Sequence, residues 1–191
     1  MIPSSLPDEL PITVLSPGAE LWRIHGRAHD PLHFGTGGLN RFDAPEGVFG
    51  VCYLGDSLEV SFLEVFVRGS RHRMVHRNDL RTRSASAFRV LKACRLLRLH
   101  SEGLVALGLP ADMPHSEPYT ACQALALAVH RHAAGVDGIE YRSRWDDRRL
   151  CVAIFDRTEA RIDPAPIRTV RLDDLAALQP ILHAYDIRVI I

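Results

Sequence analysis

Short apolar segments along the chain predict β-strands. Residues 20–25 alternate between two faces, so that Leu21, Arg23 and His25 share one side of the predicted strand. Residues 48–54 form a continuous apolar run, which predicts a second, more deeply buried strand. Further strands are predicted within residues 88–100 and at residues 137–141, 150–155, 167–172 and 187–191.

Capping residues and apolar positions at helical spacing predict three helices. Asp56 and Glu59 form a D-x-x-E capping box, which starts the first helix at residue 57. Ser116 is the predicted N-cap of the second helix, whose apolar stripe includes Leu125 and Val129. The predicted helices cover residues 57–68, 117–134 and 173–184.

The order of these elements predicts the fold class. Strands outnumber helices and do not alternate with them, which favours a mixed α+β domain over a doubly wound α/β fold. Residues 1–19 are rich in Pro and Ser and are predicted to form an irregular lead-in. Residues 29–47 carry turn residues throughout and predict a long loop, a feature that is often functional in compact domains.

Composition and charge narrow the class of protein. The chain has 191 residues, of which 47% are hydrophobic, enough to bury one core. Its 23 basic and 23 acidic residues give zero net charge, which disfavours a protein built chiefly to coat nucleic acid. Four separated cysteines are predicted to be buried free thiols, which indicates a reducing compartment and a cytoplasmic location. No apolar run is long enough to span a membrane, and no signal peptide is visible.

Two polar clusters suggest other functions. His72 and His76 are four residues apart, but they lie among arginines without a nearby carboxylate pair, so metal binding is disfavoured. The arginine run between residues 68 and 83 has two interpretations. It is either a solvated surface segment or a docking patch for an acidic protein partner.

Glu64 is the strongest candidate for a functional side chain. The predicted helix over residues 57–68 is apolar on two sides, with a narrow polar arc that holds Ser57, Ser61, Glu64 and Arg68. A carboxylate on such a helix is either paired or functional. The pattern leaves open an i,i+4 ion pair with Arg68 and a catalytic role.

Three other candidates have ordinary explanations when each is taken alone: Arg23 as an exposed arginine, Tyr53 as a core tyrosine, and Ser143 as a turn residue. Together with Arg41 and Glu64, in this order, they resemble the RES-domain family, named for an Arg, a Glu and a Ser. The matching segments are LWRIH, NRFDAPEGVFGVCYLGDS, SFLEVF and DGIEYRSR, followed by the apolar LCVAIFD.

The chain departs from the family pattern at two places. Leu39 and Asn40 precede Arg41, where family members often have glycines. Arg142 precedes Ser143, where a proline is common. Neither departure removes a functional group.

The resemblance covers residues 20–156 and implies an ADP-ribosyltransferase-like α+β fold with mainly antiparallel sheets and flanking helices. It leaves residues 157–191 as a C-terminal extension expected to pack on the same domain. It also implies that NAD binds as a substrate in a cleft between sheets. The protein would be a toxin, neutralised by an antitoxin that blocks this cleft. Nucleic acid would be contacted only indirectly, through the antitoxin. The sequence leaves open whether the protein forms a homo-oligomer.

The resemblance also implies a role for each of the five residues. Glu64 would stabilise positive charge on the ribose as the bond to nicotinamide breaks. Arg23 and Arg41 would hold the pyrophosphate, while Tyr53 and Ser143 would orient nicotinamide and ribose. Glu64, Ser143 and Arg23 are the expected catalytic set, and neither a metal nor a further cofactor is required.

The acceptor of the ribosyl group is left open by the sequence. Water would make the protein an NAD glycohydrolase, inorganic phosphate an NAD phosphorylase, and a protein side chain an ADP-ribosyltransferase. NAD degradation is favoured, because no segment is typical of a protein-substrate loop. A non-catalytic protein-binding module on the same scaffold is a further alternative, supported by the arginine run.

Overall fold

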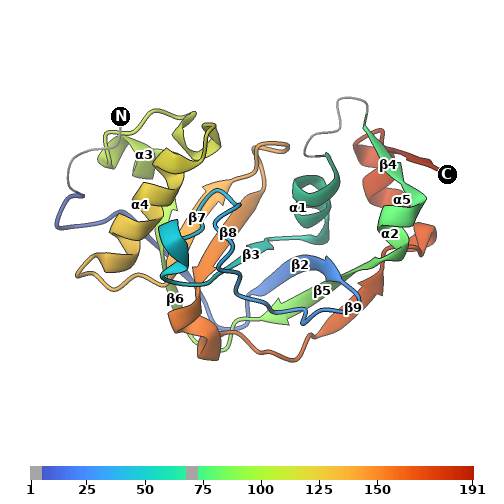
Figure 1. The fold of residues 1–191 in the computed structure, drawn as a ribbon, viewed down its shortest axis with the longest axis horizontal. Helices are drawn as coiled ribbons and strands as arrows, with labels where there is room; N and C mark the ends of the chain where they lie inside the picture. The colour runs from blue at the N-terminus through green and yellow to red at the C-terminus, as the bar shows by residue number, and fades with distance from the viewer. Residues whose placement is uncertain (1–5, 68–72) are drawn as a thin grey trace.

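The computed structural model describes residues 6–67 and 73–191. In this part of the chain, eight strands form one sheet in the order β1-β6-β7-β8-β3-β2-β5-β9, and β4 pairs with β10 beside it. Neighbours in the large sheet are antiparallel except β6 and β7. The predicted α+β fold with a mainly antiparallel sheet and flanking helices is therefore confirmed (Figure 1).

The strands are β1 (Ile12–Leu15), β2 (Glu20–Gly26), β3 (Val51–Gly55), β4 (Met74–His76), β5 (Arg83–Arg89), β6 (Cys94–Leu99), β7 (Gly138–Arg142), β8 (Leu150–Phe155), β9 (Arg168–Arg171) and β10 (Arg188–Ile190). The helices are α1 (Leu58–Phe62), α2 (Arg77–Arg81), α3 (Glu102–Ala106), α4 (Thr120–Arg131) and α5 (Leu175–Ala184). A π-helical turn, Leu63–Val67, continues α1.

The large sheet is weakly joined between β2 and β3. The two strands share one register pair, Trp22 with Gly55, whereas β2 pairs with β5 along its whole length. Helix α1 lies directly over this split. A Cβ atom on Gly55 would lie 2.4 Å from Val60 Cγ1 and 2.8 Å from Ser61 Oγ, so the close approach of α1 to β3 requires a glycine.

Two apolar cores lie on one face of the sheet, one on each side of the split. Side chains of β3, β6, β7 and β8 pack against α4 in the first core. Side chains of β2 and β5 pack against α1 and α5 in the second. Figure 1 shows α1 between the group formed by α3 and α4 and the group formed by α2 and α5. A third core covers the opposite face and includes Leu21, Cys52 and Leu54.

Three local predictions were wrong. The lead-in is not irregular throughout, because β1 pairs with β6 as an edge strand of the large sheet. Asp56 does not cap the first helix: Ser57 accepts from Val60 N, while Asp56 accepts from Leu150 N and ties α1 to β8. Ser116 does not cap α4, because its hydroxyl donates to the Met113 carbonyl in the preceding turn.

The four cysteines are buried and form no disulfide bonds, as the sequence predicts. Within residues 6–67 and 73–191, no helix combines the length and apolar character needed to cross a bilayer.

Candidate active site

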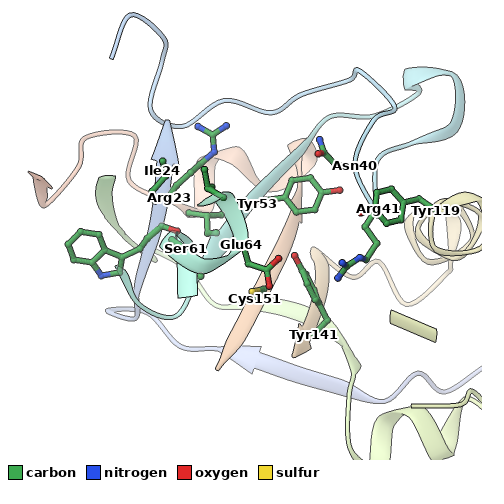
Figure 2. Close-up of a pocket in the computed structure, with 14 residues that line it drawn as sticks. Arg23, Ile24, Asn40, Arg41, Tyr53, Ser61, Glu64, Tyr119, Tyr141 and Cys151 are labelled. Atoms are coloured by element: carbon green, nitrogen blue, oxygen red, sulfur yellow. Dashed lines mark hydrogen bonds between the residues drawn. The ribbon is translucent and has the colours of Figure 1, made fainter. Parts of the chain in front are cut away.

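A cavity opens at the split between β2 and β3, beneath α1 and beside α4. It holds about 850 Å³ of empty space, part of it open to solvent. The part of this space that a water-sized molecule can occupy is about 240 Å³, just below the range of about 300–1,000 Å³ that is typical of small-molecule sites. The lining comes from seven separate segments of the chain, and its residues are drawn in Figure 2: Trp22, Arg23, Ile24, Asn40, Arg41, Tyr53, Leu54, Gly55, Ser61, Glu64, Val65, Tyr119, Tyr141 and Cys151.

Glu64 and Ser143 meet at this cavity. Glu64 stands on the π-helical turn after α1, and Ser143 follows the end of β7. The Ser143 hydroxyl donates to Glu64 Oε1 at 2.7 Å, and Arg144 N donates to the same oxygen at 3.3 Å. Two donors therefore fix the carboxylate on one side, although these residues are 79 positions apart in the sequence.

Ser143 is itself held by the turn that it begins. Trp145 N and Asp146 N donate to its hydroxyl oxygen at 3.1 and 3.4 Å. Because the oxygen accepts from the backbone, its own proton is directed to Glu64. The usual turn chemistry of a serine and the contact with Glu64 are thus combined in one side chain.

The same turn is anchored to the C-terminal part of the chain. The buried Asp146 carboxylate accepts from Arg148 and from the Tyr185 hydroxyl, the latter at 2.7 Å. The hydrogen bonds from Arg148, followed by that from Tyr185, hold the pKa of Asp146 well below its usual range. Asp146 therefore stays charged and keeps both partners.

Tyr53 organises the loop that carries Arg41. Its hydroxyl donates to Asp43 Oδ1 at 2.9 Å and accepts from Phe42 N at 2.8 Å. Asp43 in turn accepts from Asn40 N and Nδ2. Burial, and then the Asp43 charge, raise the pKa of Tyr53 well above its ordinary value, so its proton stays in place.

Arg41 is buried between two aromatic rings. Its Cζ atom lies 5.6 Å from the Tyr119 ring centroid and 5.7 Å from that of Tyr141. The side chain is 8% exposed, yet its Nε atom has no hydrogen-bond partner. A buried guanidinium that is flanked by rings and lacks a full set of acceptors is suited to hold an anion.

Arg23 borders the cavity but does not contact Glu64. Trp22 faces the core around α1, so Arg23 leaves β2 on the opposite face, as the alternation predicts. Its guanidinium donates to the Pro31 carbonyl at 2.7 Å. In Figure 2 the guanidinium groups of Arg23 and Arg41 lie on different sides of the Glu64 carboxylate.

The floor of the cavity is uncharged at neutral pH. Burial raises the pKa of Tyr141 and of Cys151 well above their ordinary values, and the nearby Glu64 carboxylate adds to both shifts. The thiol is therefore no nucleophile here. The charged groups that border the cavity are Glu64, Arg23 and Arg41.

The structure brings together four of the five predicted residues, namely Glu64, Ser143, Tyr53 and Arg41, and places Arg23 at the edge of the same cavity. Sequence reasoning missed Tyr141 and Tyr119. The signal for Tyr141 was available, because strand alternation puts it on the same side as Ser143, two residues later. Tyr119 lies in an irregular segment before α4, where no periodicity exists.

Some predictions cannot be followed in the structure. Arg68, the possible partner of Glu64, lies outside the described residues, as do Arg71 and His72. The structure therefore does not test the expectation that His72 and His76 bind no metal, nor the interpretation of that part of the arginine run. In the described part of the chain, no three His, Cys, Asp or Glu side chains gather as a metal site requires.

One comparison with known proteins shows the family of this chain, and another shows its fold. A family model described as the RES domain matches residues 20–174. The chain is also similar to a chain of the M. tuberculosis MbcT–MbcA toxin–antitoxin complex, with a TM-score of 0.68 and 20% identity. That match covers 88% of this chain and 91% of the other. No curated protein sequence matched. Because the family model spans most of its length, this chain belongs to the RES domain family.

Proposed function

We propose that this protein is an NAD-degrading toxin that breaks the bond between nicotinamide and ribose. The observation that carries the proposal is the hydrogen bond between Ser143 and Glu64 at a cavity bordered by aromatic rings and two arginines. Membership of the RES family supports this substrate. The fold shared with a chain of a toxin–antitoxin complex supports the role as a toxin.

The proposed reaction begins with heterolysis of the glycosidic bond. The bonding electron pair leaves with the nicotinamide nitrogen, so nicotinamide departs neutral and the ribose becomes an oxocarbenium ion. Glu64 stabilises this positive charge, and its orientation is already set by Ser143 and Arg144 N. Because both bonds go to Oε1, we assign Oε2 to the ribose.

The arginines and aromatic rings are assigned to binding. Arg23 and Arg41 hold phosphate groups. Tyr53 orients the ligand, either by direct contact or by ordering the loop that carries Arg41. The rings of Tyr119 and Tyr141 wall the cavity beside Arg41. Such preorganised groups lower the barrier by fixing the reacting bond against Glu64.

The second step captures the ribosyl cation. Water adds its oxygen to the anomeric carbon and releases a proton, giving ADP-ribose. Inorganic phosphate adds an oxygen instead, giving ADP-ribose phosphorylated at the same carbon. We favour these two acceptors over a protein side chain, because the reacting carboxylate lies at a cavity and not on an open surface.

We also propose that an antitoxin protein covers the mouth of this cavity in the cytoplasm. Leu39, Val65 and Trp145 are exposed apolar side chains that belong to the cavity lining or stand next to lining and catalytic residues. A protein seated over the mouth of the cavity would bury these three side chains.

The first experiment follows nicotinamide release from NAD by purified protein, with and without inorganic phosphate. We expect release in the wild type, and a loss of at least about a hundredfold in Glu64→Gln, since the charge that stabilises the cation is removed. Glu59→Gln, one turn earlier on α1, is the matched control and should remain active. No release under any condition, or full activity in Glu64→Gln, would overturn the proposal.

A second experiment separates the enzyme from its alternatives. Expression of the wild type should arrest growth, and Glu64→Ala should abolish the arrest while the purified variant stays folded. Unchanged arrest would favour a non-catalytic binding module. Transfer of label from adenine-labelled NAD to protein, in place of free ADP-ribose products, would favour an ADP-ribosyltransferase.

A further inference from the structure

Ser101 stands at a sharp turn between a strand and a helix, in a strained backbone conformation. It follows β6 and precedes α3, with φ 49° and ψ −131°. These angles are unfavourable for a serine, since only glycine adopts a positive φ without a steric penalty. The Ser101 hydroxyl makes no capping hydrogen bond to α3, so helix capping does not explain the conformation. Residues held in such strain are concentrated at functional sites.

The approach of α3 to β6 is equally tight. A Cβ atom on Gly103 would lie 2.1 Å from the Arg98 carbonyl oxygen, so this position requires a glycine. A strained serine at a strand-to-helix turn, followed two residues later by a glycine, is an arrangement that exposes a nucleophilic hydroxyl in many hydrolases. Ser101 is exposed in this structure too. The chemistry of the turn then depends on the groups that surround the hydroxyl.

An imidazole and a buried carboxylate stand in line behind this hydroxyl. His100 Nδ1 lies 3.1 Å from Ser101 Oγ, and His100 Nε2 lies 3.0 Å from Glu140 Oε1. The Glu140 side chain is 8% exposed and that of His100 is 14% exposed. An ionised carboxylate only accepts hydrogen bonds, so in the neutral ring Nε2 carries the proton and Nδ1 has the lone pair. This lone pair faces the Ser101 hydroxyl.

Arg142 adds a positive charge to the group. Its Nη2 donates to Ser101 Oγ at 3.3 Å, and its Nη1 donates to the Asp147 carbonyl, which anchors the side chain. Because Ser101 Oγ accepts from Arg142, its own proton is free to pass to His100. The guanidinium also lies beside the atom to which a reacting carbonyl group would bond, where negative charge would develop.

These groups lie apart from the cavity that holds Glu64. Strand alternation directs Glu140 and Arg142 to the face of β7 opposite Tyr141, whose ring lines that cavity. Neither His100 nor Ser101 belongs to the cavity lining. The proposed cleavage of NAD uses none of these side chains, so they are available for a different reaction.

We propose that Ser101, His100 and Glu140 form a second catalytic site, a serine hydrolase triad that cleaves short-chain carboxylic esters. Ser101 Oγ bonds to the ester carbonyl carbon while its proton passes to His100 Nδ1. The bond to the alcohol oxygen then breaks, and the alcohol leaves with that proton. Glu140 stabilises the imidazolium that exists between these steps, and Arg142 stabilises the negative carbonyl oxygen.

Water completes the reaction. Its oxygen adds to the acyl carbon, and one of its protons passes to His100 Nδ1. The bond between the acyl carbon and Ser101 Oγ then breaks, and the serine regains a proton as the carboxylic acid leaves. Because the serine is exposed, a long acyl chain would gain little apolar contact there, which favours short chains such as acetyl.

Two measurements on the purified protein test the site. They are the hydrolysis of p-nitrophenyl acetate and covalent labelling by a fluorophosphonate, located by peptide mass spectrometry. We expect label on Ser101, and we expect Ser101→Gly to lose the label and at least about a hundredfold in hydrolysis rate. Glycine suits the positive φ, so this variant should fold at least as well as the wild type. Ser16→Gly, at an exposed serine between β1 and β2, is the matched control.

Variants of the other two residues test the triad as a unit. His100→Gln should abolish labelling because the base is lost, and Glu140→Gln should slow hydrolysis at least about tenfold because the imidazolium loses its counter-charge. Should either variant fail to fold, Ser101→Gly decides. Wild-type rates in any folded variant, label on another residue, or no label and no hydrolysis by the wild type would overturn the proposal.

The two activities of the chain should fail independently. Glu64→Gln should keep the fluorophosphonate label and the rate of ester hydrolysis, because Glu64 takes no part in the second site. Ser101→Gly should keep nicotinamide release from NAD. Loss of ester hydrolysis in Glu64→Gln would place the reaction in the cavity, and it would overturn the assignment to Ser101.

Discussion

At the scale of single residues, the function of Tyr53 is to hold a loop. Its hydroxyl bridges Asp43 and the backbone of Phe42 in the long segment between β2 and β3. Asp43 is 2% exposed, so a lost donor would not be replaced by water. The position of Arg41 in the cavity therefore depends on this phenolic oxygen, together with Gln123, whose Nε2 donates to the carbonyls of Gly38 and Asn40.

Tyr53→Phe should loosen this loop. We expect the KM for NAD to rise several-fold, with a smaller change in kcat, because Arg41 shifts while Glu64 and Ser143 keep their contact. The free energy of unfolding should fall by about 1–3 kcal/mol, the cost of leaving a buried polar group unpaired. Steady-state kinetics and urea unfolding measure the two effects. An unchanged KM would show that Tyr53 does not position Arg41.

The sequence allowed some site residues to be predicted and not others. Glu64 and Ser143 were accessible because a carboxylate on an apolar helix and a serine in a polar turn are visible in the local pattern. Tyr119 was not, because its importance arises from its contact with Arg41, which is far away in the chain. An unpaired buried nitrogen is a property of packing and leaves no trace in periodicity.

At the scale of elements, the position of the Glu64 carboxylate depends on how α1 packs on the sheet. Ser57 caps the helix, Ser61 donates to the Trp22 carbonyl at 2.9 Å, and Gly55 gives the helix room. The helix then widens into a π-helical turn that contains Glu64. Turns of this kind are frequent at functional sites, where they redirect a side chain.

Gly55→Ala should therefore disturb the active site from a position that bears no functional group. The new methyl would meet Val60 and Ser61, so α1 must move away from β3. We expect a loss of about 1–3 kcal/mol in unfolding free energy, as for other overpacked sites, and a fall in kcat. Gly37→Ala, where nothing lies within 4 Å, is the matched control. Equal activity of both variants would contradict this account of α1.

Element prediction was accurate where hydrophobic patterning is strong. The range predicted for β8 is the one observed, and the ends of β2 and β9 differ by at most one residue. The π-helical turn was missed, because a helical pattern cannot distinguish i+4 from i+5 spacing over five residues. β1 was missed because its strand character comes from pairing with β6, not from its own alternation.

At the scale of the whole molecule, distant parts of the chain meet at the split in the sheet. The family model ends at residue 174, yet Tyr185 at the end of α5 reaches back to Asp146 in the turn that begins with Ser143. Asp146 N also donates to the Ser143 hydroxyl. The C-terminal residues are therefore connected to the Glu64 carboxylate through Asp146 and Ser143.

This chain of contacts makes Tyr185 a positioning residue, which Tyr185→Phe can test. Removing the hydroxyl takes one donor from Asp146 but keeps the ring, so the turn loosens while the cavity lining is unchanged. We expect kcat to fall several-fold, about 1 kcal/mol of barrier, with the KM for NAD unchanged. The decisive measurement is a double-mutant cycle. In a Ser143→Ala background the same substitution should have little further effect on kcat, because coupled residues are not additive. An equal fall in both backgrounds would mean that Tyr185 supports the fold and does not act through Ser143.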